Sequence, residues 1–239
     1  MTPATFSGIT IDQLIRSARK TVGLSITPEA QLIVRAPKRL PLAAVNAMVA
    51  QKADWILRKQ AEVRARSAER KTHAYAEGES FLLLGKAYAL HYDAKAKRMI
   101  LSGDKIVLPL CGPERAQALL IAWYQKQARE VFLARIAYYS PLMSVHCGVV
   151  RLSGAHGRWG SCGPSGSINL VWRLVMAPVE VIDYVIVHEL AHIKRRDHSA
   201  AFWQEVARIL PNYPKQRQWL KEHGAALEYH DYSSVTQKD

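Results

Sequence analysis

One apolar, helix-forming stretch limits most strongly what this chain of 239 residues can fold into. It is VIVHELAHIKRRDHSAAFW, at residues 185–203. It carries His188 and His192 four positions apart, Glu189 beside the first, and His198 six positions after the second. Residues four apart project from one face of an α-helix, so both imidazoles can reach a single zinc ion. Glu189 is rotated by about 100° from His188, which places its carboxylate beside the ion. The stretch therefore has the HExxH arrangement of zinc peptidases.

The residues on either side of the histidine pair predict a single helix from Pro178 to Arg196. Pro178 suits the first helical position, and Glu180 brings negative charge to the first turn, where the helix dipole favours it. Lys194 and the two arginines after it supply positive charge at the carboxyl end, where the dipole favours cations. The pair is therefore expected on a helix of about five turns.

A third ligand is expected from the residues that follow this helix. His198 has the spacing from His192 of the HExxHxxGxxH metzincins, but Arg195 takes the place of their glycine. No methionine follows Met176, so the methionine turn of the metzincins is missing as well. Ser199 is a good N-cap for a second helix, which would place His198 at a rigid junction between two helices.

Glu205 is the alternative third ligand. It lies thirteen residues after His192 on the expected second helix, as in enzymes whose third ligand is a glutamate. His198 is favoured because the helix junction sets its position and it needs no long reach. Glu205 would then be either a partner of a ligand imidazole or a side chain that faces solvent. One Zn2+ per chain is expected, since the sequence contains one such cluster.

The residues before the helix predict an antiparallel hairpin. VVRLSGAHGRWGSCGPSGSINLVWRLVMAP reads as two strands joined by the turn-rich CGPSG at residues 162–166. Either GSINLVWRL or the RWGSC strand can form the edge with which an extended peptide pairs by β-augmentation. Arg158 and Trp159 are expected to line the substrate cleft, with a buried Trp159 that braces the hairpin as the alternative.

Two further roles stay open in the sequence. Cys162 is either a thiolate that approaches and inhibits the metal or a small residue at the turn. Four side chains are candidates for stabilising the oxyanion, and their spacing selects none of them: His156, Tyr213, His223 and Tyr229.

The front of the chain predicts a small region of mixed strand and helix. Residues 24–37 read as two short strands around a turn, and residues 42–66 as one long amphipathic helix. The polar segment 67–76 predicts a loop or a boundary. SFLLLG, AYALHY, RMILS and KIVLPL follow as a small antiparallel sheet, and CGP at 111–113 opens a long helix that should end before Pro141.

Composition fits an ordinary globular protein, with 49% hydrophobic and 22% charged residues. No run of eighteen apolar residues is present, and the first residues lack the apolar core of an export signal. Cys111, Cys147 and Cys162 form no CxxC pair, which fits a reducing compartment. The sequence therefore predicts a cytoplasmic protein with no membrane partner, and it leaves the oligomeric state unknown.

The net charge is +13, and the surplus lies mainly at the front of the chain. Residues 1–70 contain twelve Lys and Arg against five Asp and Glu. Phosphate contacts are made by such side chains, so weak contact with DNA or RNA through this region is one expectation. A solvated basic surface that aids solubility is the other.

Five groups of residues carry a resemblance to a known family: RWGSC at 158–162, INLVWRLVMAP, YVIVHELAHIKRRDHSAAFW, TVGLSI with VRAP, and KADWI. Over nearly its whole length the chain resembles the YgjP-like family of zinc metallopeptidases, which is related to SprT-like and WLM-type HExxH proteases. The resemblance implies His188, His192 and His198 as Zn2+ ligands and Glu189 as the catalytic base.

The same resemblance implies an α+β fold. Residues 113–239 would form a minimal zincin-like domain, an antiparallel hairpin plus the HExxH helix and following helices. Residues 1–112 would form a basic accessory region of short strands and one long helix. The predicted function is zinc-dependent hydrolysis of a protein or peptide. The alternatives are a nucleic-acid-associated binding protein with a structural or weakly active zinc site and, less favoured, a non-peptide zinc hydrolase. Glu189 favours the peptidase, because a structural site needs no carboxylate beside the metal.

Overall fold

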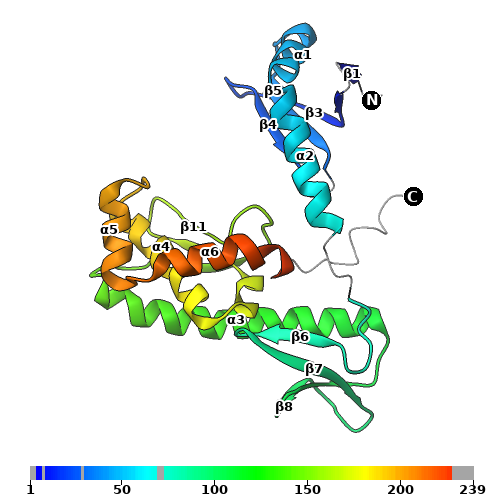
Figure 1. Ribbon diagram of the computed structural model, residues 1–239, viewed down its shortest axis with the longest axis vertical. Helices are drawn as coiled ribbons and strands as arrows, with labels where there is room; N and C mark the ends of the chain where they lie inside the picture. The colour runs from blue at the N-terminus through cyan, green and yellow to red at the C-terminus, as the bar shows by residue number, and fades with distance from the viewer. Residues whose placement is uncertain (1–3, 7–8, 28–29, 69–72, 228–239) are drawn as a thin grey trace. The chain divides into compact units, whose positions relative to one another are not determined.

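A computed structural model describes residues 4–6, 9–27, 30–68 and 73–227 (Figure 1). The chain divides into two compact units, Met1–Arg70 and Lys71–Asp239, and the boundary falls within the polar segment 67–76 that the sequence indicated. Both units combine helices with small sheets, which confirms the α+β class. None of the helices within the described ranges is long and apolar enough to cross a membrane.

The N-terminal unit holds two small sheets and two helices. Its elements are β1 (Ala4–Phe6), β2 (Ile9–Ile11), β3 (Gln13–Ser17), β4 (Gly23–Ile26), β5 (Leu32–Pro37), α1 (Leu42–Gln51) and α2 (Ala53–Ala68). β4 and β5 pair antiparallel, as predicted, and β3 pairs parallel with β5. The single helix expected over 42–66 is instead two, because the backbone at Lys52 leaves the helical region with φ −104° and ψ 15°. Val45 and Val49 of α1 and Ile56 of α2 are still buried in one core with residues of β5.

The second unit begins with a four-stranded sheet, formed by β6 (Ser80–Leu83), β7 (Lys86–Asp93), β8 (Ile100–Ser102) and β9 (Lys105–Pro109). The strand order is β6-β7-β9-β8, and β7 runs parallel to β9, so the sheet is mixed and not antiparallel as predicted. Phe81, Leu90 and Ile106 are buried in the same core as the helices that follow. The compact unit that contains the histidines therefore begins at Lys71, whereas the sequence placed this sheet with residues 1–112.

The helices of the second unit are α3 (Pro113–Leu142), α4 (Val179–Lys194), α5 (Ala200–Ile209) and α6 (Tyr213–His223), with 3-10 turns η1 (Trp172–Met176) and η2 (Gly224–Leu227). In Figure 1 the long α3 lies between the four-stranded sheet and the pair α4 and α6. α3 continues through Pro141, which falls in its last turn, so the predicted end was too early. α4 confirms the predicted helix, since it begins directly after Pro178 and ends at Lys194.

A second sheet in this unit contains β10 (Val150–Ser153), β11 (Gly160–Cys162) and β12 (Ile168–Val171), in the order β10-β12-β11. The sequence predicted two strands, but β10 adds a third that is parallel to β12. The strand expected to run on through Leu174 ends at Val171, where η1 begins. β12 is central, so GSINLVWRL is not an edge strand. The RWGSC strand, β11, lies at an edge and contacts α4.

An ion pair joins α3 to the helix of the histidines. Arg135 donates from Nε and Nη2 to the two carboxylate oxygens of Asp183, both at 2.5 Å. The side chain of Asp183 is 9% exposed and that of Arg135 is 30% exposed. This two-pronged contact fixes α4 against α3.

We expect Asp183→Asn to lower the free energy of unfolding by about 3 kcal/mol, because it leaves the Arg135 charge half-buried without its counterion. Urea unfolding followed by circular dichroism would measure the change. The control is Glu130→Gln on α3, whose carboxylate is exposed and 4.0 Å from Lys126. It should change stability by less than about 0.5 kcal/mol. Equal effects of the two substitutions would show that the ion pair does not hold the helices together.

Candidate metal centre

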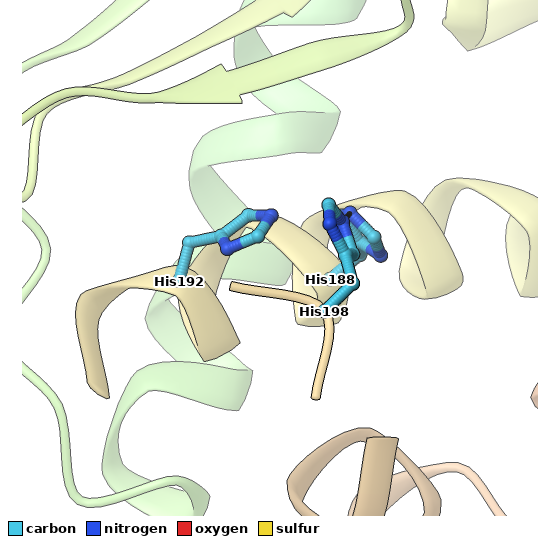
Figure 2. A group of neighbouring side chains, drawn as sticks. All are labelled: His188, His192 and His198. Atoms are coloured by element: carbon cyan, nitrogen blue, oxygen red, sulfur yellow. Dashed lines mark hydrogen bonds between the residues drawn. The ribbon is translucent and has the colours of Figure 1, made fainter. Parts of the chain in front are cut away.

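Three histidine side chains meet at the carboxyl half of α4. His188 and His192 project from α4 one turn apart, and His198 comes from the segment between α4 and α5, so the three rings face one another (Figure 2). One nitrogen of each ring lies within 4.8 Å of the others, and Nε2 of His188 is 3.1 Å from Nε2 of His198. The structure therefore brings together all three residues that the sequence nominated as ligands.

The surroundings favour neutral imidazoles, which is the form that binds metals. Burial, followed by the neighbouring histidines, lowers the pKa of His188 to about 3. Burial also lowers the pKa of His192. Nδ1 of His192 lies 3.0 Å from the carbonyl oxygen of Arg195, so a proton on Nδ1 leaves Nε2 free to act as a ligand.

Aromatic side chains hold the three rings in place. Phe202 contacts all of them, with ring centroids 4.6–4.9 Å apart. Trp203 packs against His188 and His198 and stacks on Tyr213. These packed rings restrict the rotation of the imidazoles, as a metal site requires.

Glu189 lies beside the histidine group and is 5% exposed. Burial raises the pKa of its carboxyl to about 7, and the charge of Arg158 opposes that shift. Its Oε2 atom is buried and has no hydrogen-bond partner among the residues that the structure describes. Gly160 of β11 covers the other oxygen, since a Cβ built at Gly160 would lie 2.5 Å from Oε1. The carboxylate is therefore held between α4 and the edge strand.

Glu205 takes no part in the histidine group. Its Oε2 atom accepts hydrogen bonds from Lys194 at 3.3 Å and from Arg208 at 3.4 Å. Cys162 also lies outside the group; its thiol donates to the carbonyl of Gly163 at 3.6 Å, and burial raises its pKa. A raised pKa keeps this side chain a thiol, which is a weak metal ligand.

The two residues expected in the cleft differ in their surroundings. The indole of Trp159 packs on Gly224 at the end of α6, where a Cβ would lie 3.2 Å from its Cζ2 atom. Trp159 is half-buried, and its place in the substrate cleft stays a prediction. Arg158 is exposed and lines a hollow of about 330 Å³ on the three-stranded sheet. Its charge acts on Glu189, so it lies near the histidine group.

The candidates for the oxyanion role are separated by the fold. Tyr213 belongs to the aromatic group, since it stacks on Trp203 and on Tyr184. His156 lies 3.5 Å from Arg173, and His223 stacks on the Trp219 ring. Tyr229 lies outside the described residues. Tyr213 thus contacts Trp203, which itself packs against His188 and His198.

Two positioning residues were missed in the sequence. Arg196 donates to the carbonyl oxygens of Gly163 and Pro164, both at 2.8 Å, and so ties the end of β11 to the segment that carries His198. Gly160 was quoted within RWGSC without a role. A glycine inside a strand often marks a close approach, and that signal was present in the sequence.

Comparison with known proteins identifies the class and then the family. Residues 20–223 match the model of the YgjP-like metallopeptidase domain, so this is a metallopeptidase-domain protein. The chain belongs to the YgjP-like family, as its motifs indicated. Family membership supports metallopeptidase activity and implies a divalent metal, which the histidine group could bind.

Among solved structures, the chain is similar to the metallopeptidase zymogen abylysin of Pyrococcus abyssi, with 20% identity and a TM-score of 0.36. The similarity covers 40% of this chain and 97% of that chain. No curated protein matches the chain.

Proposed function

We propose that this protein is a zinc-dependent endopeptidase. The observation that carries the proposal is the placement of three imidazoles around one point, with a buried carboxylate at their side. Two nitrogens bound to one tetrahedral zinc ion lie about 3.4 Å apart. The 3.1 Å between Nε2 of His188 and Nε2 of His198 is close to that value. A set of three histidines also leaves one coordination position open, as catalytic zinc sites do.

The roles of the residues follow from this arrangement. Zinc held by His188, His192 and His198 would polarise a peptide carbonyl and lower the pKa of water to about 7. Glu189 takes the proton from the attacking water and then delivers it to the leaving amine. Burial raises the pKa of Glu189 to about 7 in the metal-free fold, which is close to the range suited to a general base. Phe202 and Trp203 cover one side of the imidazoles, and His198 is exposed to solvent.

The open edge of β11 supports binding of an extended peptide. The N–H of Val171 donates to the carbonyl of Trp159 at 2.9 Å. The N–H of Gly163 donates to the carbonyl of Ser167 at 2.7 Å. Bonded and non-bonded positions alternate in an antiparallel pair, so the N–H and C=O of Gly160 point away from β12. A peptide strand that pairs with Gly160 would pass over the catalytic carboxylate.

We expect the purified protein to contain about one zinc ion per chain and to cleave casein or a fluorogenic peptide. A chelator should abolish the cleavage, and added zinc should restore it. Elemental analysis and a hydrolysis assay before and after chelation make the test, with circular dichroism to verify that the metal-free protein stays folded. Absence of zinc after reconstitution, or cleavage that survives chelation, would contradict the proposal.

Gly160→Ala should reduce peptide hydrolysis by about tenfold or more while zinc stays bound. The added methyl group would meet the Glu189 carboxylate at 2.5 Å and displace it from the metal. Gly157→Ala is the matched control, because a Cβ there meets no atom within 4 Å. The test compares the hydrolysis rates and the zinc contents of the two variants. Wild-type activity in Gly160→Ala would show that the carboxylate position tolerates movement.

The alternative function, a nucleic-acid-associated binding protein, stays a prediction. Contact with DNA or RNA would come from the basic residues 1–70, a compact unit separate from the one that holds the histidines. A metal site that serves only structure has no use for a buried carboxylate beside it, and Glu189 is such a group. The peptidase is therefore the function that the site supports best.

A further inference from the structure

A polar hollow of about 330 Å³ lies on the three-stranded sheet. Arg151 of β10, Asn169 of β12 and Ser161 of β11 line it, together with Arg158, which comes just before β11. Asn169 is paired across the sheet with both Arg151 and Ser161, so the three form one row from edge to edge. Residues in register share a face of the sheet, and Asn169 Nδ2 donates to Ser161 Oγ at 3.2 Å on that face. The alternate residues of β12 are buried in the core, so this polar row belongs to the outer face.

The hollow carries positive charge, and neither of its two arginines contacts a carboxylate in the described part of the chain. Arg151 and Arg158 are both exposed, and neither makes a hydrogen bond or an ion pair with any residue in the described part of the chain. Among the residues that the structure describes, no aspartate or glutamate lines the hollow. In the same unit, Arg135 binds Asp183 and Arg196 binds backbone carbonyls, so neither of these two is available to an anion. Two unpaired guanidinium groups beside a serine and an asparagine form a set of donors suited to an anion.

The hollow adjoins the candidate catalytic site. Gly160 lines it and also covers the Glu189 carboxylate. The charge of Arg158 reaches that same carboxylate. A peptide paired with the open edge of β11 would direct alternate side chains toward the outer face, beside Ser161. The hollow is therefore within reach of a side chain of the bound substrate.

We propose that this hollow is a specificity subsite that binds the carboxylate of an aspartate or glutamate side chain in a peptide held along β11. The inference rests on the proposed peptidase function, and it narrows the substrates to acidic peptides. A guanidinium group matches a carboxylate through two parallel N–H···O bonds, and Ser161 and Asn169 offer further donors. Because both arginines are exposed, water and salt weaken the attraction, so the preference is a matter of selectivity more than of total affinity.

The test uses the zinc-loaded Glu189→Gln variant, which should bind peptides without cleaving them. Fluorescein-labelled peptides with an acetylated amino end and an amidated carboxyl end would carry Asp, Glu, Asn, Gln or Lys at one position at a time. At the preferred position, Asp or Glu should bind about five- to tenfold more tightly than Asn or Gln at low salt, as measured by anisotropy. A neutral peptide with a free carboxyl end tests whether a chain terminus is the true source of the carboxylate.

Substitution of Arg151 provides the cleaner second arm, because Arg158 also acts on Glu189. Arg151→Gln, made in the binding variant, should remove most of the preference for acidic peptides, and Arg151→Glu should reverse it toward Lys. Arg98→Gln is the matched control, since Arg98 is an exposed arginine in the loop between β7 and β8, strands of the four-stranded sheet. Wild-type protein should show the same order of peptides in kcat/KM.

Several results would overturn the inference. Equal affinity for acidic and amide peptides, or a preference that survives Arg151→Gln, would remove the subsite and leave the peptidase function intact. Tighter binding of the free-terminus peptide would assign the hollow to a carboxyl end, and displacement by a single-stranded oligonucleotide would assign it to phosphate. Failure of every peptide to bind and to be cleaved would overturn the proposed function along with it.

Discussion

Replacing Glu189 by glutamine should leave zinc bound and reduce peptide hydrolysis by about 10²- to 10⁴-fold, the contribution of a positioned general base. The amide has the shape of the carboxylate but cannot accept the proton of the attacking water. Kinetics on a fluorogenic peptide and elemental analysis of the same sample would measure both properties. Glu180→Gln is the matched control, since Glu180 is an exposed glutamate in the first turn of the same helix. It should keep the wild-type rate.

Glu189→Gln should also affect the stability of the metal-free protein, and this effect is independent of catalysis. Burial raises the pKa of Glu189 from its ordinary value of 4.5 to about 7, so the ionised side chain is destabilising in the metal-free fold above that range. A neutral glutamine avoids this cost, and the melting temperature of the metal-free variant should not fall below that of the wild type at pH 8.

In the hydrolysis assay, a wild-type rate for Glu189→Gln would remove Glu189 from the mechanism. Loss of zinc would make its role structural.

The sequence predicted the site helix well because its information is local. His188 and His192 are one turn apart on any helix, and Pro178 and Lys194 mark where that helix begins and ends. His198 required one further step, the recognition of Ser199 as the start of α5. Ser199 does occupy the N-cap position there, although its hydroxyl donates to Asp197 at 2.8 Å and not to the helix backbone.

The sheets were predicted less well because strand pairing is not written in local periodicity. An alternating pattern reports that a strand has one buried face, but it does not name the neighbouring strand. The parallel pairs β7 with β9 and β10 with β12 join segments that are separated by other structure. In the second pair, Arg173 holds the connection by donating to the carbonyl oxygens of Gly154 and Ala155. The segment GSINLVWRL that contains this arginine was predicted to be a strand, whereas Arg173 lies in η1.

The role of Gly160 and the composition of the hollow depend on the same tertiary contacts. Arg151 and Arg158 are seven residues apart in the sequence and come from opposite sides of a loop. Arg151 lies in β10 and Arg158 comes just before β11. The two line one hollow because β12 lies between β10 and β11 in the sheet. Such an arrangement requires the strand order, which became visible in the structure alone.

His198→Ala should cost more zinc affinity than the 10- to 100-fold typical of partners outside the ligand set, and it should abolish detectable hydrolysis. The substitution removes one of three nitrogens that lie within 4.8 Å of one another. The remaining pair on α4 would leave two coordination positions to water, which weakens the site. Competition with a zinc-sensitive dye measures the affinity. His223→Ala is the matched control, because His223 is an exposed histidine that stacks on Trp219.

Glu205→Ala separates the two possible ligand sets. The carboxylate of Glu205 is bonded to Lys194 and Arg208 and stands apart from the imidazoles. Its removal should therefore change zinc affinity by less than tenfold. To act as a ligand, Glu205 would have to give up both cations and move toward the α4 pair, and His198 would have to withdraw from contact with His188. If Glu205→Ala releases the metal while His198→Ala retains it, that rearrangement occurs and the site has two histidines and one glutamate.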